Sequence, residues 1–464
     1  MTPCRRPHLA SRVSIPVAVL ALSACTPPGA APDEAPRSPA PTRGHAPPEP
    51  DFHNPVDFAG WWGHRQFRPD WPAGETVYAE ALFQHGDAAW PPPDEVAAAQ
   101  LRMGSQRSWA AAELASLAAY LDRIASQVDA LARAARHEHV RWLADPPGTS
   151  FWLSLDVPAD ASRLLSRATL ARAWMKVDAD GAESESLIQA WQILLRHAHH
   201  MEQMGASAAV LLGMDIRVSA YASIRSLLNA TSLLNATSFS GAELAAVQDL
   251  LREAPPIPGY GESLRMEWAG LLDFLQHLYP GGRFSSEAAC RMQQRDRLPP
   301  RGMFLPSPQV TARGFDEWYE PLVRLVDTPW SASVFAQLRA RESARASQVE
   351  SNLILEAYIP NHNNAYRSAL RAETERRATE LLLALYLARD ATGGWPASLD
   401  ACPGDLDGIR GDPLSGDDFR YLVDNGNPIL YSVGFDGHDD GGTHDATWSG
   451  RIGRDVVFTP RSYR

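Results

Sequence analysis

Lysine is almost absent from this chain of 464 residues, because Lys176 is the only one and the other basic residues are arginines. Acidic residues outnumber basic residues by 55 to 43, which gives a formal net charge of −12. A surface of this sign repels phosphate backbones. The composition therefore argues against nucleic acid as a partner.

Signature motifs of the common enzyme classes are also absent. The chain has no G-x-S-x-G nucleophile elbow, no Walker loop and no dinucleotide-binding fingerprint. The stretch "HEHVR" at 137–141 begins like a zinc protease motif, but Arg141 stands where the second histidine is required. An enzyme whose catalytic residues are scattered along the sequence is the alternative interpretation, although a non-catalytic role is favoured.

The N-terminus contains an apolar run, Val13–Leu22, that is too short to span a membrane as a helix. It follows three arginines, and Cys25 comes directly after the small residues Ser23 and Ala24. This order is typical of a signal peptide. The residues 22–25, "LSAC", resemble the lipobox of bacterial lipoproteins, and the resemblance implies that Cys25 is lipidated. An ordinary secretory signal with a chance cysteine is the alternative.

The resemblance also implies a destination, because Thr26 and not Asp follows the lipidated cysteine. In Gram-negative lipoproteins this favours the outer membrane, with the protein facing the periplasm. Residues 26–50 contain nine prolines and little apolar bulk, so they predict a semi-rigid tether of up to roughly 75 Å. Removal of residues 1–25 takes three of the 43 basic residues and no acidic ones, which leaves 40 against 55 and a net charge of −15.

Cysteine is rare, with four in the chain. Cys4 is lost with the predicted signal peptide and Cys25 is predicted to be lipidated, so Cys290 and Cys402 remain in an oxidising compartment. A disulfide between them would contribute about 4–5 kcal/mol by restricting the unfolded chain. Two separate buried thiols are an equally good interpretation.

The folded part is predicted to be mostly α-helical, with an irregular lead-in at 51–93, a helical body at 94–365 and a small α+β module at 366–464. In the lead-in, Trp61, Trp62 and Trp71 either anchor the segment on the body or form a glycan-binding platform. Apolar spacings of three and four predict one long helix from Ser108 to about Leu143. They also predict a helical hairpin at 164–198 and further paired helices, in a solenoid or a bundle. The residues 240–243, "SGAE", predict a capping box at the start of another helix, and Gly393, Gly394 and Pro396 predict the end of the last long helix.

The C-terminal residues contain "LLLALYLARDATGGWPASLDA", "DPLSGDDFRYLV" and "ILYSVGFDGHDDGG", in that order. This succession resembles the globular domain of type II secretion major pseudopilins. A group of long uncharacterised bacterial envelope proteins with helical middles is similar to the chain over most of its length. The resemblance implies an α+β module with a calcium-binding loop. The pseudopilin assembly helix "G-F-T-L-x-E" does not precede it, so pilin-like polymerisation is not expected.

The loop at 431–442, "YSVGFDGHDDGG", combines three aspartates with four glycines. Calcium binds several oxygens at once, and glycines allow carboxylates and carbonyls to converge. The resemblance implies Asp436, Asp440 and Asp445 as calcium ligands. Asp455 is a further candidate ligand, as are the carbonyls of Tyr431 and Gly434. An EF-hand is excluded because Thr447 occupies its last ligand position. A solvated loop without an ion is the alternative.

A second cluster, "RHAHHMEQM" at 196–204, places two histidines and two methionines on one helical face: His197, His200, Met201 and Met204. Imidazole and thioether groups are ligands for copper. A packing surface between helices is the favoured interpretation.

Taken together, these patterns predict an outer-membrane-anchored periplasmic lipoprotein. It would act as a non-catalytic scaffold or adaptor for envelope or secretion proteins, with a calcium-stabilised C-terminal module. The alternative is a periplasmic glycan-binding protein or hydrolase that uses the tryptophan-rich segment.

Overall fold

The structure is a computed structural model of the whole chain. It describes residues 46–58, 61–62, 70–83, 111–142, 159–180, 185–234, 240–285, 307–328, 332–349, 352, 354–355, 359, 362–442 and 455–459. The predicted signal peptide, Cys25 and most of the predicted tether lie outside these ranges.

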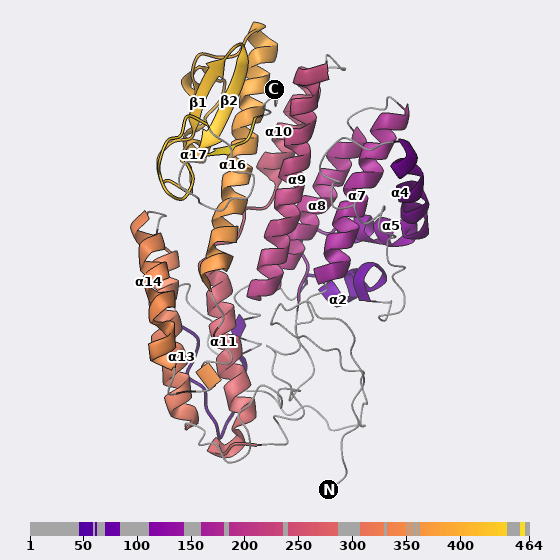
Figure 1. The fold of residues 1–464 in the computed structure, drawn as a ribbon. Helices are drawn as coiled ribbons and strands as arrows, with labels where there is room; N and C mark the ends of the chain where they lie inside the picture. The colour runs from indigo at the N-terminus through magenta and orange to yellow at the C-terminus, as the bar shows by residue number, and fades with distance from the viewer. Residues whose placement is uncertain are drawn as a thin grey trace.

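The described chain is mostly α-helical, with a small antiparallel sheet near the C-terminus, and this part of the predicted fold class is confirmed (Figure 1). The helices are α2 (Gly74–Val77), α4 (Ala111–Arg123), α5 (Ala125–Ala134), α7 (Ala159–Asp180), α8 (Glu185–Gln203), α9 (Ser207–Leu234), α10 (Gly241–Glu253), α11 (Tyr260–Leu278), α13 (Pro308–Val326), α14 (Ala332–Val349), α16 (His362–Thr392) and α17 (Asp407–Arg410). Three short helical turns are η1 (Ala79–Phe83), η2 (Pro280–Gly282) and η3 (Leu399–Ala401). The strands are β1 (Arg420–Asp424), β2 (Asn427–Ser432) and β3 (Val456–Val457).

Helices α7, α8, α9 and α16 lie side by side, each in contact with the next (Figure 1). The predicted hairpin is confirmed as α7 and α8, which follow one another in the chain and are in contact. The indole N–H groups of Trp174 on α7 and Trp191 on α8 both donate to Ser223 Oγ on α9, at 3.2 and 3.0 Å. Because all three side chains are fully buried, this shared acceptor fixes the three helices in one arrangement.

The single helix predicted from Ser108 to about Leu143 is wrong within the described residues. The helix breaks at Ile124 into α4 and α5, and α5 ends at Ala134. Arg141 instead pairs with the lead-in, where its N–H donates to Pro72 O at 2.8 Å and its carbonyl accepts from Gly74 N at 2.9 Å. A backbone contact with a distant segment therefore overrides the helical pattern.

Local signals set several other helix ends as predicted. Ser240 and Glu243 form the predicted capping box at the start of α10. Helix α16 ends at Gly393, which has a φ of 76° and supplies the left-handed conformation that L residues rarely adopt. Both ends follow from the local sequence alone.

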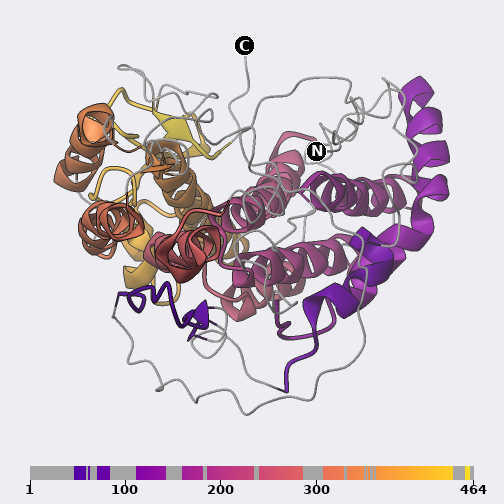
Figure 2. The same ribbon diagram turned by 90° about the horizontal axis from the view of Figure 1, so that it is seen from below.

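The described parts of the lead-in run along the helices (indigo in Figure 2). Gln276 on α11 donates to Val56 O at 2.7 Å and accepts from Val56 N at 3.0 Å. Trp62 is buried against Gly205, where a Cβ atom would lie only 2.5 Å from the indole. Burying an aromatic ring contributes about 2–3 kcal/mol, so these contacts hold the lead-in on the body.

Helix α9 is apolar over Ser207–Leu228 and long enough to cross a membrane, but 61% of its most apolar window is buried inside the molecule. It contacts α8 on one side and α16 on the other. These contacts are those of a core helix.

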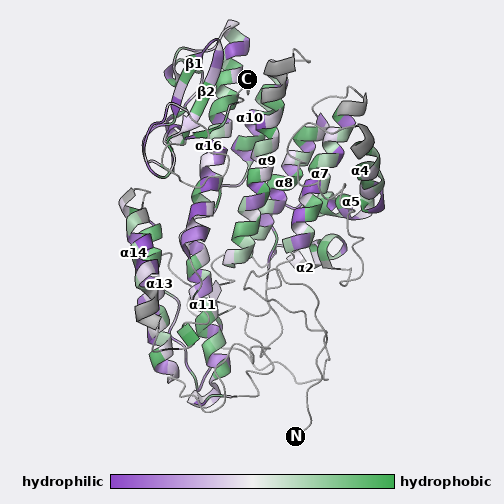
Figure 3. Ribbon diagram, in the orientation of Figure 1, coloured by the Kyte–Doolittle hydropathy of each residue, from purple (hydrophilic) through white to green (hydrophobic). Residues whose placement is uncertain are grey.

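Helix α16 joins the helical body to the sheet. Hydrophilic residues dominate its first half and the apolar run 381–385 lies in its second half (Figure 3). The sheet has the order β1-β2-β3, and Leu430, Phe419 and Phe458 belong to the same hydrophobic core as the body helices. The predicted boundary between residues 365 and 366 falls in the first turn of α16. Body and C-terminal module are therefore joined by a continuous helix and one core.

Candidate functional site

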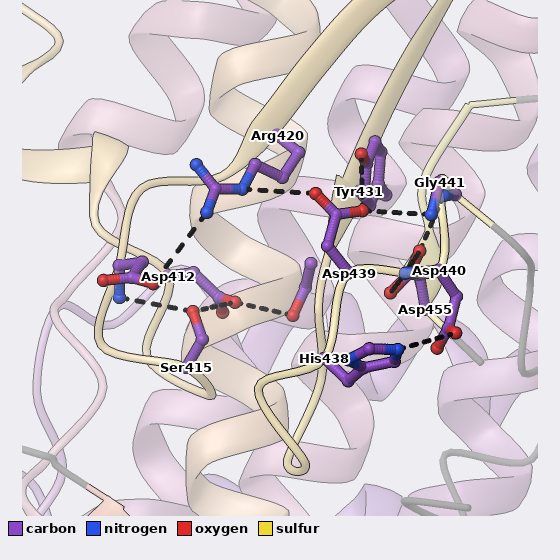
Figure 4. A network of polar contacts seen from close by, with 12 residues as sticks. Asp412, Ser415, Arg420, Tyr431, His438, Asp439, Asp440, Gly441 and Asp455 are labelled. Atoms are coloured by element: carbon purple, nitrogen blue, oxygen red, sulfur yellow. Dashed lines mark hydrogen bonds and ion pairs between the residues drawn. The ribbon is translucent and has the colours of Figure 1, made fainter. Parts of the chain in front are cut away.

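The acidic loop follows β2 and leads toward β3 (Figure 4). Four glycines in it have positive φ angles between 65° and 76°: Gly434, Gly437, Gly441 and Gly442. Such angles are open to glycine without steric penalty, so the chain turns sharply several times within ten residues. These turns bring three carboxylates close together: Asp439, Asp440 and Asp455.

The predicted calcium ligands are placed differently from one another. Asp436 is exposed, and its Oδ1 accepts from His438 N at 3.1 Å, which closes a local turn. Asp440 lies with its Oδ1 3.7 Å from His438 Nε2. Asp445 lies outside the described residues. Among the residues that are described, no three His, Cys, Asp or Glu side chains converge as metal ligands, so the predicted set is only partly visible.

Asp455, the further candidate ligand, is the most enclosed of the described acids at this site. Its side chain is fully buried, and its carboxylate accepts from Asp440 N at 3.1 Å and from Gly442 N at 2.6 Å. Desolvation raises the pKa of Asp455, the two backbone N–H groups oppose the rise, and the charges of Asp439 and Asp440 add to it. A bound cation would relieve this accumulation of negative charge.

Asp439 is a member of the site that the sequence pattern did not single out. Its Oδ1 accepts from Tyr431 Oη and from Gly441 N, both at 3.0 Å, and its Oδ2 lies 3.7 Å from Arg420 Nε. Desolvation, with Asp439 as a neighbour, raises the pKa of Tyr431 to about 12. The hydroxyl of Tyr431 therefore stays protonated and donates its hydrogen bond to Asp439. The sequence had suggested the carbonyl of Tyr431 as a calcium ligand, whereas the contact seen in the structure is made by its hydroxyl.

Asp412 is a second buried carboxylate, and it supports the acidic loop from the turn at Asp412 and Pro413. Asp412 accepts from Leu414 N at 2.9 Å, from Ser415 Oγ at 2.8 Å and from Ser432 Oγ at 2.7 Å (Figure 4). Burial raises its pKa and these hydrogen bonds oppose the rise. Because Ser432 ends β2, Asp412 fixes the point from which the acidic loop departs.

The histidine cluster of α8 is a buried contact with the lead-in. Tyr78 Oη lies 2.7 Å from His200 Nδ1 and 3.1 Å from His197 Nδ1. Desolvation lowers the pKa of His197 to about 3 and that of His200 well below its usual range, so both rings are neutral near pH 7. Met201 and Met204 are buried beside them. These contacts favour the packing interpretation over a copper site.

The structure describes some of the remaining predicted site residues, which are the two cysteines and the tryptophans of the lead-in. Cys402 is a buried thiol, whereas Cys290 lies outside the described residues, so their disulfide stays a prediction. Trp62 is buried, and Trp71 stacks on His139 with ring centroids 4.3 Å apart. These contacts favour the anchoring role of the tryptophans over a glycan platform.

Comparisons with known proteins give no match: no protein-family model, no curated protein and no solved structure matches the chain.

Proposed function

We propose that this protein is a lipid-anchored scaffold or adaptor of the outer membrane, facing the periplasm, that serves envelope assembly or secretion. The lipobox-like residues ending at Cys25 and the proline-rich tether supply the anchor and the reach. The pseudopilin-like order of motifs at the C-terminus suggests a role beside secretion components. The chain's acidic charge and lack of catalytic motifs agree with a binding role.

The observation that carries the proposal is the close packing between the sheet and the helical body. Arg225 on α9 forms a largely buried ion pair with Glu375 on α16, and it donates to Thr379 Oγ1 at 2.8 Å. Its guanidinium carbon also lies 5.5 Å from the centre of the Phe458 ring, next to β3. Tyr386 Oη donates to Leu228 O at 2.8 Å. These contacts hold the sheet in one orientation on the helices. A scaffold needs such an orientation, because it can position a partner only if its own parts keep their arrangement.

We further propose that calcium stabilises the acidic loop. Asp440 and Asp455 would hold the ion together with Asp436 and Asp445, and carbonyls of the glycine-rich turns would add oxygen ligands. The ion would supply positive charge beside a buried carboxylate and would act structurally. Its binding would fix the connection between β2 and β3.

The test is crosslinked co-purification from solubilised membranes, with Cys25→Ala as the variant that removes the proposed lipid. Cys4→Ala is the matched control, because Cys4 leaves with the predicted signal peptide. We expect palmitate labelling and recovery of envelope or secretion proteins with the wild type and Cys4→Ala, and a loss of both with Cys25→Ala.

Two outcomes would contradict the proposal. Equal labelling in all three strains would place the lipid elsewhere or exclude it. Recovery of peptidoglycan fragments in place of proteins would support the glycan-binding alternative instead.

A further inference from the structure

Among the described strands, β1 forms one edge of the sheet, because β2 pairs with it on one side and no other described strand pairs with it. Figure 1 shows β2 between β1 and α16. Leu422 and Val423 of β1 are 36% and 42% exposed, and they are neighbours on this edge. An exposed apolar edge strand is a template for pairing with another strand.

The hairpin turn determines which backbone groups of β1 face outward. The turn consists of Asn425 and Gly426, with φ angles of 51° and 78°, so Asp424 and Asn427 form the hydrogen-bonded pair that closes a two-residue loop. Alternate residues of a strand direct their N–H and C=O groups to opposite sides. The backbone groups of Tyr421 and Val423 therefore point away from β2.

The neighbouring residue supports this assignment. Phe419 lies two residues before Tyr421, so its backbone groups point to the same side of the strand. Its N–H donates to Arg410 O at 2.9 Å, on the side away from β2. Beyond Phe419, no described residue pairs with the outer side of the strand. Two N–H groups and two carbonyls are thus available at this edge.

We propose that β1 pairs antiparallel with β1 of a second copy of the chain, about a two-fold axis at Leu422. In this register Tyr421 of each copy faces Val423 of the other, so four backbone hydrogen bonds form. Leu422 faces Leu422 of the second copy as a non-hydrogen-bonded pair, in which side chains approach most closely. The two exposed leucines then cover each other.

Charge supports the same partner and the same register. The side chains of Arg420 and Asp424 lie on the face of Leu422, at the two ends of the strand. In the two-fold arrangement each arginine faces an aspartate of the second copy. Edge strands usually carry charges that discourage pairing, but here the charges of two copies are complementary.

The contacts of Arg420 within its own chain are weak competitors. Its guanidinium lies 3.9 Å from Asp417 and 3.7 Å from Asp439, and the arginine side chain is 45% exposed. Exposed pairs at such distances contribute little. A two-fold axis at Tyr421 or Val423 would form only two backbone hydrogen bonds at this edge and would separate the opposite charges, so the register at Leu422 is favoured.

The first test is disulfide crosslinking of the full chain carrying Cys25→Ser, with Leu422→Cys or Val423→Cys added. Directly opposed residues of an antiparallel pair are within disulfide range, whereas two copies of residue 423 would be offset by two positions and lie beyond about 7 Å. Val423 is the more exposed of the two, so random collisions would favour it. We expect a several-fold higher yield of crosslinked dimer from Leu422→Cys.

The second test uses charge exchange, measured by sedimentation at increasing concentration. Arg420→Asp places two acids opposite each other in the dimer, and Asp424→Arg places two arginines opposite each other. Each variant alone should stay monomeric, and an equal mixture should form heterodimers because the charges are complementary again. The mixture also shows that both variants are folded.

Three results would overturn the proposal. The first is equal crosslinking at positions 422 and 423, and the second is a wild-type chain that stays monomeric throughout. The third is a mixture that associates no better than the separate variants. Protection of β1 from hydrogen exchange only after addition of an envelope extract would assign the edge to a different protein.

Discussion

Buried carboxylates of the helical body and of the C-terminal sheet are stabilised in different ways. Glu202 in the body has a guanidinium beside it, because Arg217 donates to its two oxygens at 2.7 and 2.8 Å. In the sheet region, Asp412 and Asp455 accept hydrogen bonds from backbone N–H and serine hydroxyl groups. The body thus neutralises this buried charge internally, whereas the sheet region retains negative charge. Sensitivity to cations is therefore expected in the sheet region.

Glu267 of α11 is an exception within the body, because this buried carboxylate accepts its hydrogen bonds from hydroxyl groups. Its oxygens accept from Ser207 Oγ at 2.5 Å and from Tyr319 Oη at 3.2 Å. Burial, only partly opposed by these hydroxyls, raises its pKa to about 7. A buried acid with hydroxyl partners thus titrates near neutral pH.

The largest expected effect is the loss of the buried ion pair. Arg217→Met leaves the Glu202 carboxylate without a counter-charge in the core, and we expect a loss of about 3–5 kcal/mol in the free energy of unfolding, measured with urea. Arg163→Met is the control, since Arg163 makes a surface pair with Asp215 and should cost less than about 1 kcal/mol. Equal losses in the two variants would contradict the account. Adding Glu202→Leu to Arg217→Met should restore most of the stability.

The next effect is the pH dependence caused by Glu267. Between pH 4.5 and about 7 the unfolded chain loses this proton while the folded chain keeps it. Stability therefore falls as pH rises through that window, by up to about 3 kcal/mol. Glu267→Gln should remove this fall and leave the protein more stable than wild type at pH 8. Urea unfolding at pH 5 and pH 8 measures it, with the exposed Glu317→Gln as control; an unchanged pH profile in Glu267→Gln would contradict it.

Features set by local sequence were the ones predicted from it. The apolar stripe of α8, the capping box at Ser240 and the stop at Gly393 depend on residues a few positions apart. The end of α5 at Ala134 was missed, because the chain after it is fixed by the pairing of Arg141 with Pro72 and Gly74. No periodicity within residues 108–143 contains that information.

The acidic loop shows that prediction from local sequence has the same limit at the candidate site. Its glycines and aspartates were visible, but the sequence does not reveal which of three neighbouring acids turns inward. Asp436 closes a local turn, Asp439 binds Tyr431, and Asp440 presents its N–H to Asp455. Asp412 was missed because Ser432, one of its partners, lies 20 residues away. The contact of Asp440 with Asp455 depends on the β2–β3 pairing, which is a tertiary contact.

The response to calcium is the smallest expected effect. It tests most directly the central claim that the sheet region, with its uncompensated carboxylates, is stabilised by a cation. Thermal unfolding of the chelated full chain should shift upward when calcium is added to about 1 mM, by the equivalent of roughly 0.4–1.4 kcal/mol for an extracellular-type site. Asp455→Asn and Asp440→Asn should abolish the shift, while Asp249→Asn on the surface of α10 should keep it. A wild-type melting temperature that does not respond to calcium, or an undiminished response in Asp455→Asn, would contradict the account.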